Sequence, residues 1–266
     1  MIDLLRARWR QKSRTLAWPD GPPPELPARF RGHPVFAAGR CADGCSACAG
    51  VCPTGAIRLT PALGIDLGRC LFCGECAQAC PSGALSFGGD WRLAARQRED
   101  LEVDERETVR LAGALDEKSR RLFGHSLRLR QVSAGGCNGC EAEINVLQTI
   151  VWDIGRFGIQ IVASPRHADG LLVTGPVTAN MRLALRKTWA AVAPPKLVVA
   201  VGACAISGGP YAGHPEVRDG ADGEVPVDLY VPGCPPHPLT LLDGLLRLLG
   251  RLESAREAPR SNRRNA

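Results

Sequence analysis

Two short runs of cysteine near the N-terminus constrain this chain more than any other feature. Each run holds four of the twelve cysteines, Cys41, Cys45, Cys48 and Cys52 in the first and Cys70, Cys73, Cys76 and Cys80 in the second, and each ends in Cys-Pro. The second run has the spacing C-x2-C-x2-C-x3-C-P, in which the first three thiolates bind one 4Fe–4S cluster and the fourth binds the other cluster. We therefore assign Cys41, Cys45, Cys48 and Cys80 to one 4Fe–4S cluster, and Cys70, Cys73, Cys76 and Cys52 to a second.

Two other uses of clustered cysteines fit these runs less well. Zinc sites use C-x2-C pairs separated by a longer loop and do not need a Cys-Pro ending. Disulfide frameworks belong to small secreted domains, whereas this chain opens on Met1-Ile2-Asp3-Leu4-Leu5-Arg6 without an apolar signal region, so we expect a reducing compartment. The first run departs from the motif, because three residues rather than two separate Cys41 from Cys45. A three-iron or otherwise altered cluster therefore stays open there.

Composition and charge narrow the class of protein further. The chain has 266 residues, 45% of them hydrophobic, which is ordinary for one or two globular domains. No run approaches about 18 consecutive apolar residues, so we expect no membrane-spanning helix. Aromatic residues make up only 5% of the chain and do not alternate with basic ones, so we expect no nucleic-acid partner.

The net charge of +6 is concentrated in a basic N-terminal arm and Pro-rich connector, residues 1–32. Residues 1–40 hold eight Lys and Arg against three acidic residues and so carry +5 of it. Five cations between residues 6 and 14 share the arm with Leu4, Leu5 and Trp9, a mixture that suits a short interfacial or docking helix and equally a solvated arm. Residues 19–27 follow as an extended Pro-rich stretch. The polar, charged segment 254–266 is expected to be disordered.

An internal repeat marks residues 33–90 as one α+β module with two clusters. The phrases Cys52-Pro-Thr-Gly-Ala-Ile57 and Cys80-Pro-Ser-Gly-Ala-Leu85 are nearly the same. Each leads into a short apolar stretch, 57–60 or 85–87, which we predict to be a strand that closes its half of the module. Residues 91–124 mix Arg and Glu with spaced Leu and Val, which predicts a helical bridge to the rest of the chain.

Residues 125–253 have the pattern of a doubly wound, flavodoxin-like α/β domain. Strand-like apolar runs occur at 127–132, 159–163, 171–174, 197–201 and 229–231, and helical patterns lie between or after them, chiefly at 180–192 and 239–253. Strands and helices that alternate in this way predict a parallel sheet covered by helices.

The remaining four cysteines, Cys137, Cys140, Cys204 and Cys234, each follow a predicted strand in a Gly-rich stretch. Sites of open α/β sheets form outside the C-terminal ends of the strands, so we expect these thiols to meet at one edge and hold a third 4Fe–4S cluster. Inert structural cysteines would instead lie within strands or helices. The chain has no G-x-G-x-x-G after a strand and no G-x4-G-K-[ST], so we expect neither an NAD site nor a phosphate-binding loop.

Four phrases around these cysteines resemble a known family. They are Gly-Cys-Asn-Gly-Cys-Glu-Ala-Glu at 136–143, Ser-Pro-Arg-His-Ala-Asp at 164–169, Gly-Ala-Cys at 202–204 and Val-Pro-Val-Asp-Leu-Tyr-Val-Pro-Gly-Cys-Pro-Pro at 225–236. They are similar to the small subunit of membrane-bound group 4 nickel–iron hydrogenases of the formate hydrogenlyase type, which is related to the B subunit of respiratory complex I. Residues 30–90 resemble a bacterial-type two-cluster ferredoxin, here fused to that subunit.

The resemblance implies an electron-transfer subunit of an oxidoreductase complex that is not catalytic alone. By similarity, Cys137, Cys140, Cys204 and Cys234 bind the cluster nearest the catalytic partner. The complex I B subunit has two adjacent cysteines where this chain has Gly139-Cys140, which favours the hydrogenase branch. One alternative is a subunit of a complex-I-like NADH or ferredoxin:quinone oxidoreductase whose terminal cluster feeds a quinone site. Another is a non-enzymatic, metal-dependent regulator that binds nucleic acid through the basic arm.

The implied partners are a hydrogenase-type or complex-I-D-type large subunit, further electron-transfer subunits and integral membrane subunits. This places the chain peripherally on the cytoplasmic face of the inner membrane. Three residues that match family phrases, Glu143, Arg166 and His167, are candidates for coupling protons to electron transfer. For Glu143 the alternative is a carboxylate favoured by a helix N-terminus, and for His167 it is an ordinary surface histidine.

Overall fold

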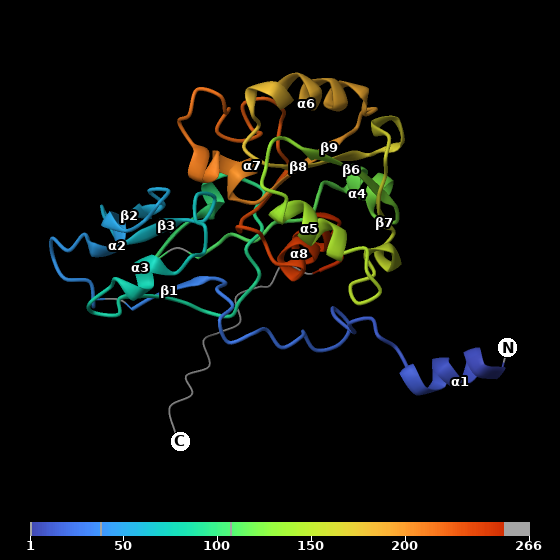
Figure 1. The fold of residues 1–266 in the computed structure, drawn as a ribbon, viewed down its shortest axis with the longest axis horizontal. Helices are drawn as coiled ribbons and strands as arrows, with labels where there is room; N and C mark the ends of the chain where they lie inside the picture. Colours follow the sequence, from blue (N-terminus) through green and yellow to red (C-terminus); the bar gives the residue numbers. More distant parts are fainter. Residues whose placement is uncertain (1, 38, 107, 253–266) are drawn as a thin grey trace.

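The computed structural model describes residues 2–37, 39–106 and 108–252. The segment 254–266, for which we expect disorder, lies outside the described residues. Within them, a small α+β module precedes a larger α/β domain, and helix α1 (Ile2–Gln11) stands apart from both (Figure 1). Both predicted fold classes are confirmed.

The α/β domain is built on one sheet of five parallel strands. They are β6 (Leu127–Ser133), β7 (Ile159–Ile161), β8 (Gly170–Thr174), β9 (Leu197–Val201) and β10 (Leu229–Val231). All five overlap the predicted strands. Their order in the sheet, β10-β9-β8-β6-β7, is the flavodoxin-like order of a doubly wound sheet.

Helices cover both faces of this sheet, because side chains of a buried strand point alternately to either side. The helices are α5 (Gly139–Val146), α6 (Ala179–Ala191), α7 (Ala203–Ser207) and α8 (Pro238–Leu248), with 3-10 turns η2 (Ile154–Phe157), η3 (Pro165–His167) and η4 (Gly209–Tyr211). Leu171 packs with Leu185 of α6 on one face, and Leu172 packs in the cluster of α5 and α8 on the other (Figure 1). Both predicted helices are present, although α8 ends at Leu248 and not at 253.

The α+β module consists of short elements around the two cysteine runs. They are β1 (Pro34–Phe36), α2 (Ala47–Gly50), β2 (Ile57–Arg58), β3 (Gly64–Asp66), α3 (Glu75–Gln78), β4 (Leu85–Phe87) and β5 (Glu102–Asp104). The predicted strands at 57–60 and 85–87 are confirmed as β2 and β4. β4 pairs antiparallel with β1, and β2 pairs antiparallel with β3, which also pairs with β5.

The predicted helical bridge over 91–124 is wrong for most of its length. Within it, α4 (Glu117–Phe123) is preceded by a single 3-10 turn, η1 (Glu99–Leu101), and by β5. Residues 93–95 are buried in succession, and Ala95 exchanges two backbone hydrogen bonds with Tyr230 of β10, at 3.0 and 2.8 Å. The spaced apolar residues therefore belong to extended chain that packs on both modules, and not to one face of a helix.

The two modules share a buried core. Ile65 and Leu67 of the first module lie in one cluster with Ala205 and Ile206 of α7. The Ser207 hydroxyl adds a buried hydrogen bond, which it donates to the Gly68 carbonyl at 2.9 Å. Because α7 begins directly after β9, this contact fixes the first module at the edge where β9 and β10 end.

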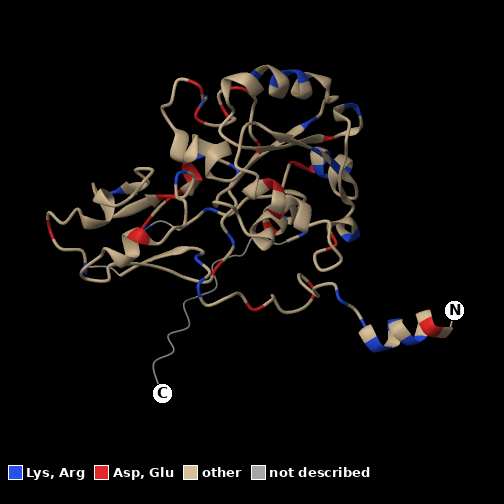
Figure 2. Ribbon diagram, in the orientation of Figure 1, with Lys and Arg blue, Asp and Glu red and all other residues tan. Residues whose placement is uncertain are grey.

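The N-terminal connector returns across the α/β domain before it enters the first module. The Arg156 guanidinium donates to the carbonyls of Leu16 and Trp18 at 2.6 and 2.5 Å, and Trp18 is buried. Helix α1 has no buried residue and carries Arg6, Arg8 and Arg10 in its second half (Figure 2). No helix in the described part of the chain is both long and apolar enough to cross a bilayer.

Candidate metal centres

The twelve cysteines fall into three groups, which we name after the expected clusters. Site 1 is Cys41, Cys45, Cys48 and Cys80, site 2 is Cys52, Cys70, Cys73 and Cys76, and site 3 is Cys137, Cys140, Cys204 and Cys234. Burial raises the pKa of Cys48, and the charges of Cys80 and Cys41 raise it further. Burial also raises the pKa of Cys70 to about 12, with contributions from the other three thiols of site 2. The structure thus brings the last cysteine of each run to the other run.

The internal repeat produces the same local geometry twice. The Ala56 amide donates to the Cys52 sulfur at 3.2 Å, and the Ala84 amide donates to the Cys80 sulfur at 3.2 Å. The hydroxyl two residues after each cysteine lies 3.8 and 3.7 Å from the sulfur. Hydrogen bonds to sulfur are one way in which a protein sets the potential of an iron–sulfur cluster. The repeated phrase therefore supplies each site with a matched amide donor.

The longer spacing in the first run is accommodated by a turn. The Cys45 amide donates to the Ala42 carbonyl at 3.1 Å, and Gly44 adopts a φ of +73° with nothing within 4 Å of an added Cβ. In the second run Gly74, with φ +82°, begins α3. Glycine adopts both conformations without strain, so each run can turn its thiols inward.

Site 3 gathers four thiols at the C-terminal ends of β6, β9 and β10. Cys137 and Cys140 follow β6, Cys204 follows β9 within α7, and Cys234 follows β10. Burial raises the pKa of Cys204 to about 11, and the charges of Cys234 and Cys137 add to it. Burial likewise raises the pKa of Cys140, followed by the charges of Glu141 and the other three thiols. Strand ends from distant parts of the sequence therefore meet as expected for an open α/β sheet.

Two glycines show how closely the site 3 thiols approach backbone. An added Cβ on Gly202, whose φ is +87°, would lie 2.5 Å from the Cys140 sulfur, and one on Gly209 would lie 2.9 Å from the Cys204 sulfur. Only glycine leaves room for sulfur at these positions. Thiolates are the ligands that iron–sulfur clusters require, so the residues of all three sites fit such clusters.

The described residues contain no three His, Cys, Asp or Glu side chains that converge closely enough to hold a single metal ion. The four thiolates of a 4Fe–4S cluster bind four separate iron atoms. They surround the cluster and do not converge on one point, so this finding concerns single-ion sites.

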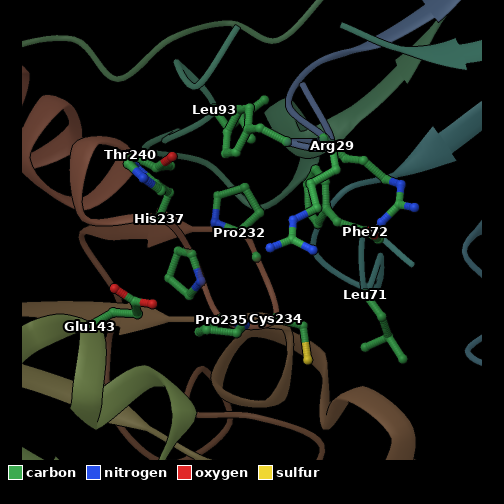
Figure 3. A pocket seen from close by; sticks show the side chains of 14 residues that line it. Arg29, Leu71, Phe72, Leu93, Glu143, Pro232, Cys234, Pro235, His237 and Thr240 are labelled. Carbon is green, nitrogen blue, oxygen red and sulfur yellow. Dashed lines mark hydrogen bonds between the residues drawn. The ribbon is translucent and has the colours of Figure 1, made fainter. Parts of the chain in front are cut away.

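The three sites follow one another through the molecule. Burial raises the pKa of Cys76, and the charges of Cys73 and Cys52 in its own site add to it. The charge of Cys48 also contributes, which links site 1 to site 2. Partial burial of the thiol, the charge of Cys137 and then that of Cys73 raise the pKa of Cys234, which links site 2 to site 3. A cavity of about 290 Å³ lies beside this junction (Figure 3).

The structure separates the three candidate proton-coupling residues. Glu143 lines the cavity together with Cys234 and His237 (Figure 3), and burial raises its pKa. Arg166 and His167 are exposed residues of η3, which leads into the N-terminal end of β8. Because the cysteines of site 3 follow the C-terminal ends of the strands, the structure does not bring these two residues to site 3.

Sequence reasoning missed Glu141, the buried carboxylate of site 3. Its side chain accepts hydrogen bonds from the hydroxyls of Ser133 and Thr174, both at 2.6 Å, and the residue is 6% exposed. Burial raises the pKa of Glu141, but the two hydroxyl donors outweigh it and hold the pKa below its usual range. The sequence held one indication of this role, because β6 and β8 each end in a residue with a hydroxyl group, Ser133 and Thr174.

Known protein families match two separate parts of the chain. Residues 137–248 match the family described as NADH ubiquinone oxidoreductase, 20 Kd subunit. Residues 32–84 match the 4Fe-4S dicluster domain, so that domain is present in the first module.

Three relatives cover the second half of the chain. Formate hydrogenlyase subunit 7 of Escherichia coli is 48% identical over 46% of this chain and 48% of its own length. A probable membrane-bound hydrogenase subunit of Pyrococcus furiosus is 41% identical over 50% of this chain and 79% of its own length. The B subunit of the NADH-quinone oxidoreductase of Phocaeicola vulgatus is 40% identical over 55% and 73%. The chain thus spans about half the length of the Escherichia coli relative and most of the other two.

These relatives are subunits of hydrogenases and of NADH-quinone oxidoreductases, as their names state. The resemblance found in the sequence is confirmed. The chain belongs to the NADH ubiquinone oxidoreductase 20 Kd subunit family and joins a member of that family to a 4Fe–4S dicluster domain.

Proposed function

We propose that this chain is the electron-transfer subunit of a membrane-associated hydrogenase complex and holds three 4Fe–4S clusters, at sites 1, 2 and 3. When bound, such a cluster supplies a carrier of single electrons. The thiols of the three sites would hold the clusters, and the amides that donate to Cys52 and Cys80 would help to set their potentials. Electrons would pass through sites 1, 2 and 3 in series, and site 3 would exchange them with a nickel–iron large subunit.

The observation that carries the proposal is the unbroken series of sites. Cys48 lies close enough to Cys76, and Cys73 close enough to Cys234, for the charge of one thiol to act on the other. Three unrelated structural sites would not need to lie in series, so this arrangement supports a relay. Cys137 and Cys234 are also exposed, which leaves site 3 open to a partner protein.

The partner and the location follow from the relatives. Formate hydrogenlyase subunit 7 and the membrane-bound hydrogenase subunit support a hydrogenase-type large subunit, further electron-transfer subunits and integral membrane subunits as partners. The single cysteine at Gly139-Cys140 supports the same branch. We place the chain peripherally, on the cytoplasmic face of the inner membrane.

A second candidate function is favoured by the relatives that are B subunits of NADH-quinone oxidoreductases. In a complex-I-like oxidoreductase, site 3 would face a quinone site formed with a complex-I-D-type large subunit. Purification of the intact complex separates the two functions, because nickel accompanies a large subunit of the hydrogenase type. A complex without nickel that reduces quinone would favour the second function.

Iron analysis of the full chain, purified without oxygen, tests the three-cluster proposal. We expect about twelve iron and about twelve sulfide per chain. Cys204→Ser should remove about a third of the iron and the site 3 signal in electron paramagnetic resonance, while sites 1 and 2 persist. The matched Cys45→Ser variant should affect site 1 and leave site 3 intact. About eight iron in the unmodified chain, or no loss in Cys204→Ser, would contradict the proposal.

A further inference from the structure

A short segment of the connector lies across the junction between sites 2 and 3. Residues 29–31 line the cavity of Figure 3 on one side, and Cys234 lines it on another. Phe30 packs edge-on against His237 with ring centroids 5.4 Å apart. His237 is itself fixed, because its Nδ1 accepts the Leu239 amide at the start of α8 at 3.2 Å. The segment is therefore held on the α/β domain while it borders the first module.

Arg31 reaches from this segment onto the cysteine turn of site 2. Its Nη1 donates to the Phe72 carbonyl at 3.4 Å. Its guanidinium covers Gly74, where an added Cβ would overlap Nε and lie 2.9 Å from Cζ. Phe72 and Gly74 flank Cys73, the site 2 thiol whose charge reaches Cys234. A cation therefore sits on the part of site 2 that faces site 3.

A fixed charge at this place has a definite effect on reduction. Reduction at site 2 adds one electron and hence one negative charge to the group that the four thiolates hold. A positive charge nearby favours the reduced form by Coulomb attraction.

We propose that the charge of Arg31 raises the reduction potential of site 2 relative to site 1. The inference rests on the proposed function, since it requires a cluster at site 2. The side chain is exposed, so solvent screens its charge and the effect is modest. We expect about a threefold change in the ratio of reduced to oxidised site 2 at a given potential.

A potentiometric titration followed by electron paramagnetic resonance tests the proposal on the iron-loaded full chain. The site signals are assigned beforehand with the Cys45→Ser and Cys204→Ser variants. Arg31→Gln should lower the site 2 potential by about 28 mV, the equivalent of threefold for a one-electron couple, at unchanged iron content. Arg31→Lys keeps the charge and should retain most of the potential. Arg121→Gln removes an exposed arginine of α4 that pairs with Glu117 and should leave all three potentials unchanged.

Each outcome bears on one claim. A normal site 2 signal with an unchanged potential in Arg31→Gln, or a loss in Arg31→Lys as large as in Arg31→Gln, would overturn the role of Arg31 and leave the proposed function standing. An unmodified chain without a site 2 signal would instead overturn the proposed function. Should Arg31→Gln lose iron, salt supplies the second measurement. Screening at about 1 M should lower the site 2 potential relative to site 1 in the unmodified chain, and no relative change would refute the proposal.

Discussion

Replacement of Gly202 by alanine perturbs site 3 without touching a cysteine. Gly202 directly follows β9, and its amide donates to the Val231 carbonyl at 2.8 Å, so the sheet holds its backbone in place. The added methyl carbon would lie 2.5 Å from the Cys140 sulfur. Carbon and sulfur in ordinary contact are about 3.5–4 Å apart. The substitution therefore requires the thiol to move by about 1 Å.

This displacement is large compared with the tolerance of a metal site. Ligand distances in metal centres hold to within about 0.2 Å, and Cys140 lies in the first turn of α5, which is anchored by Ile144 in the core. The alanine also carries the backbone cost of φ +87° with ψ 158°, a region essentially restricted to glycine, at about 1–3 kcal/mol. We expect Gly202→Ala to fold, to keep sites 1 and 2, and to lose the cluster of site 3.

Gly213→Ala is the matched control. Gly213 has a similar φ of +79°, but nothing lies within 4 Å of an added Cβ. It therefore tests a positive φ without a clash against sulfur. Iron analysis and electron paramagnetic resonance should show a loss of about four iron and of the site 3 signal in Gly202→Ala, and full loading in Gly213→Ala. Full iron with an unchanged site 3 signal in Gly202→Ala would refute the geometry argued for site 3.

Two further predictions concern buried charges. Arg247→Met leaves Asp243 of α8 buried without its partner at 2.7 Å and should destabilise the α8 region by about 3–5 kcal/mol, measured by native-state hydrogen exchange. The double variant with Asp243→Leu should recover most of this loss, and a double variant as unstable as the single one would contradict the pairing argument. Glu141→Ala removes the acceptor of the Ser133 hydroxyl and of the buried Thr174 hydroxyl and should cost about 1–3 kcal/mol in the same measurement. Glu141→Gln keeps an acceptor and should cost less. Because the pKa of Glu141 is held low, the loss of stability in each variant should be the same at pH 8 as at pH 6.

The sequence predicted the sheet, and it indicated the three cysteine groups, because both leave strong local patterns. Strands such as 197–201 are continuous apolar runs, as expected for a strand buried on both faces, and their C-terminal ends carry the glycines and cysteines of site 3. The repeated Cys-Pro phrase likewise fixes the same amide-to-sulfur hydrogen bonds at Cys52 and Cys80. In each case a residue acts close to its own position in the chain.

The sequence could not predict features that depend on contacts between distant segments. Two carboxylates, Glu141 and Glu143, lie two residues apart after Cys140, and the spacing does not tell which one is buried. The structure selects Glu141 because Ser133 and Thr174 end neighbouring strands beside it. The error over 91–124 has a similar origin, since Ala95 is extended only because it pairs with Tyr230 of another module.

The relation between the two modules rests on residues other than the cysteines. Each cysteine motif specifies where its own cluster is held, but electron transfer depends also on how near one site lies to the next. That separation is set by the buried pairing of Ala95 with Tyr230, by the bond from Ser207 to Gly68, and by the packing of Phe30 on His237. The substitution Ser207→Ala would therefore leave every thiol in place and act on the step between sites 2 and 3. The function that we propose thus depends on the docking of the modules as much as on the ligands themselves.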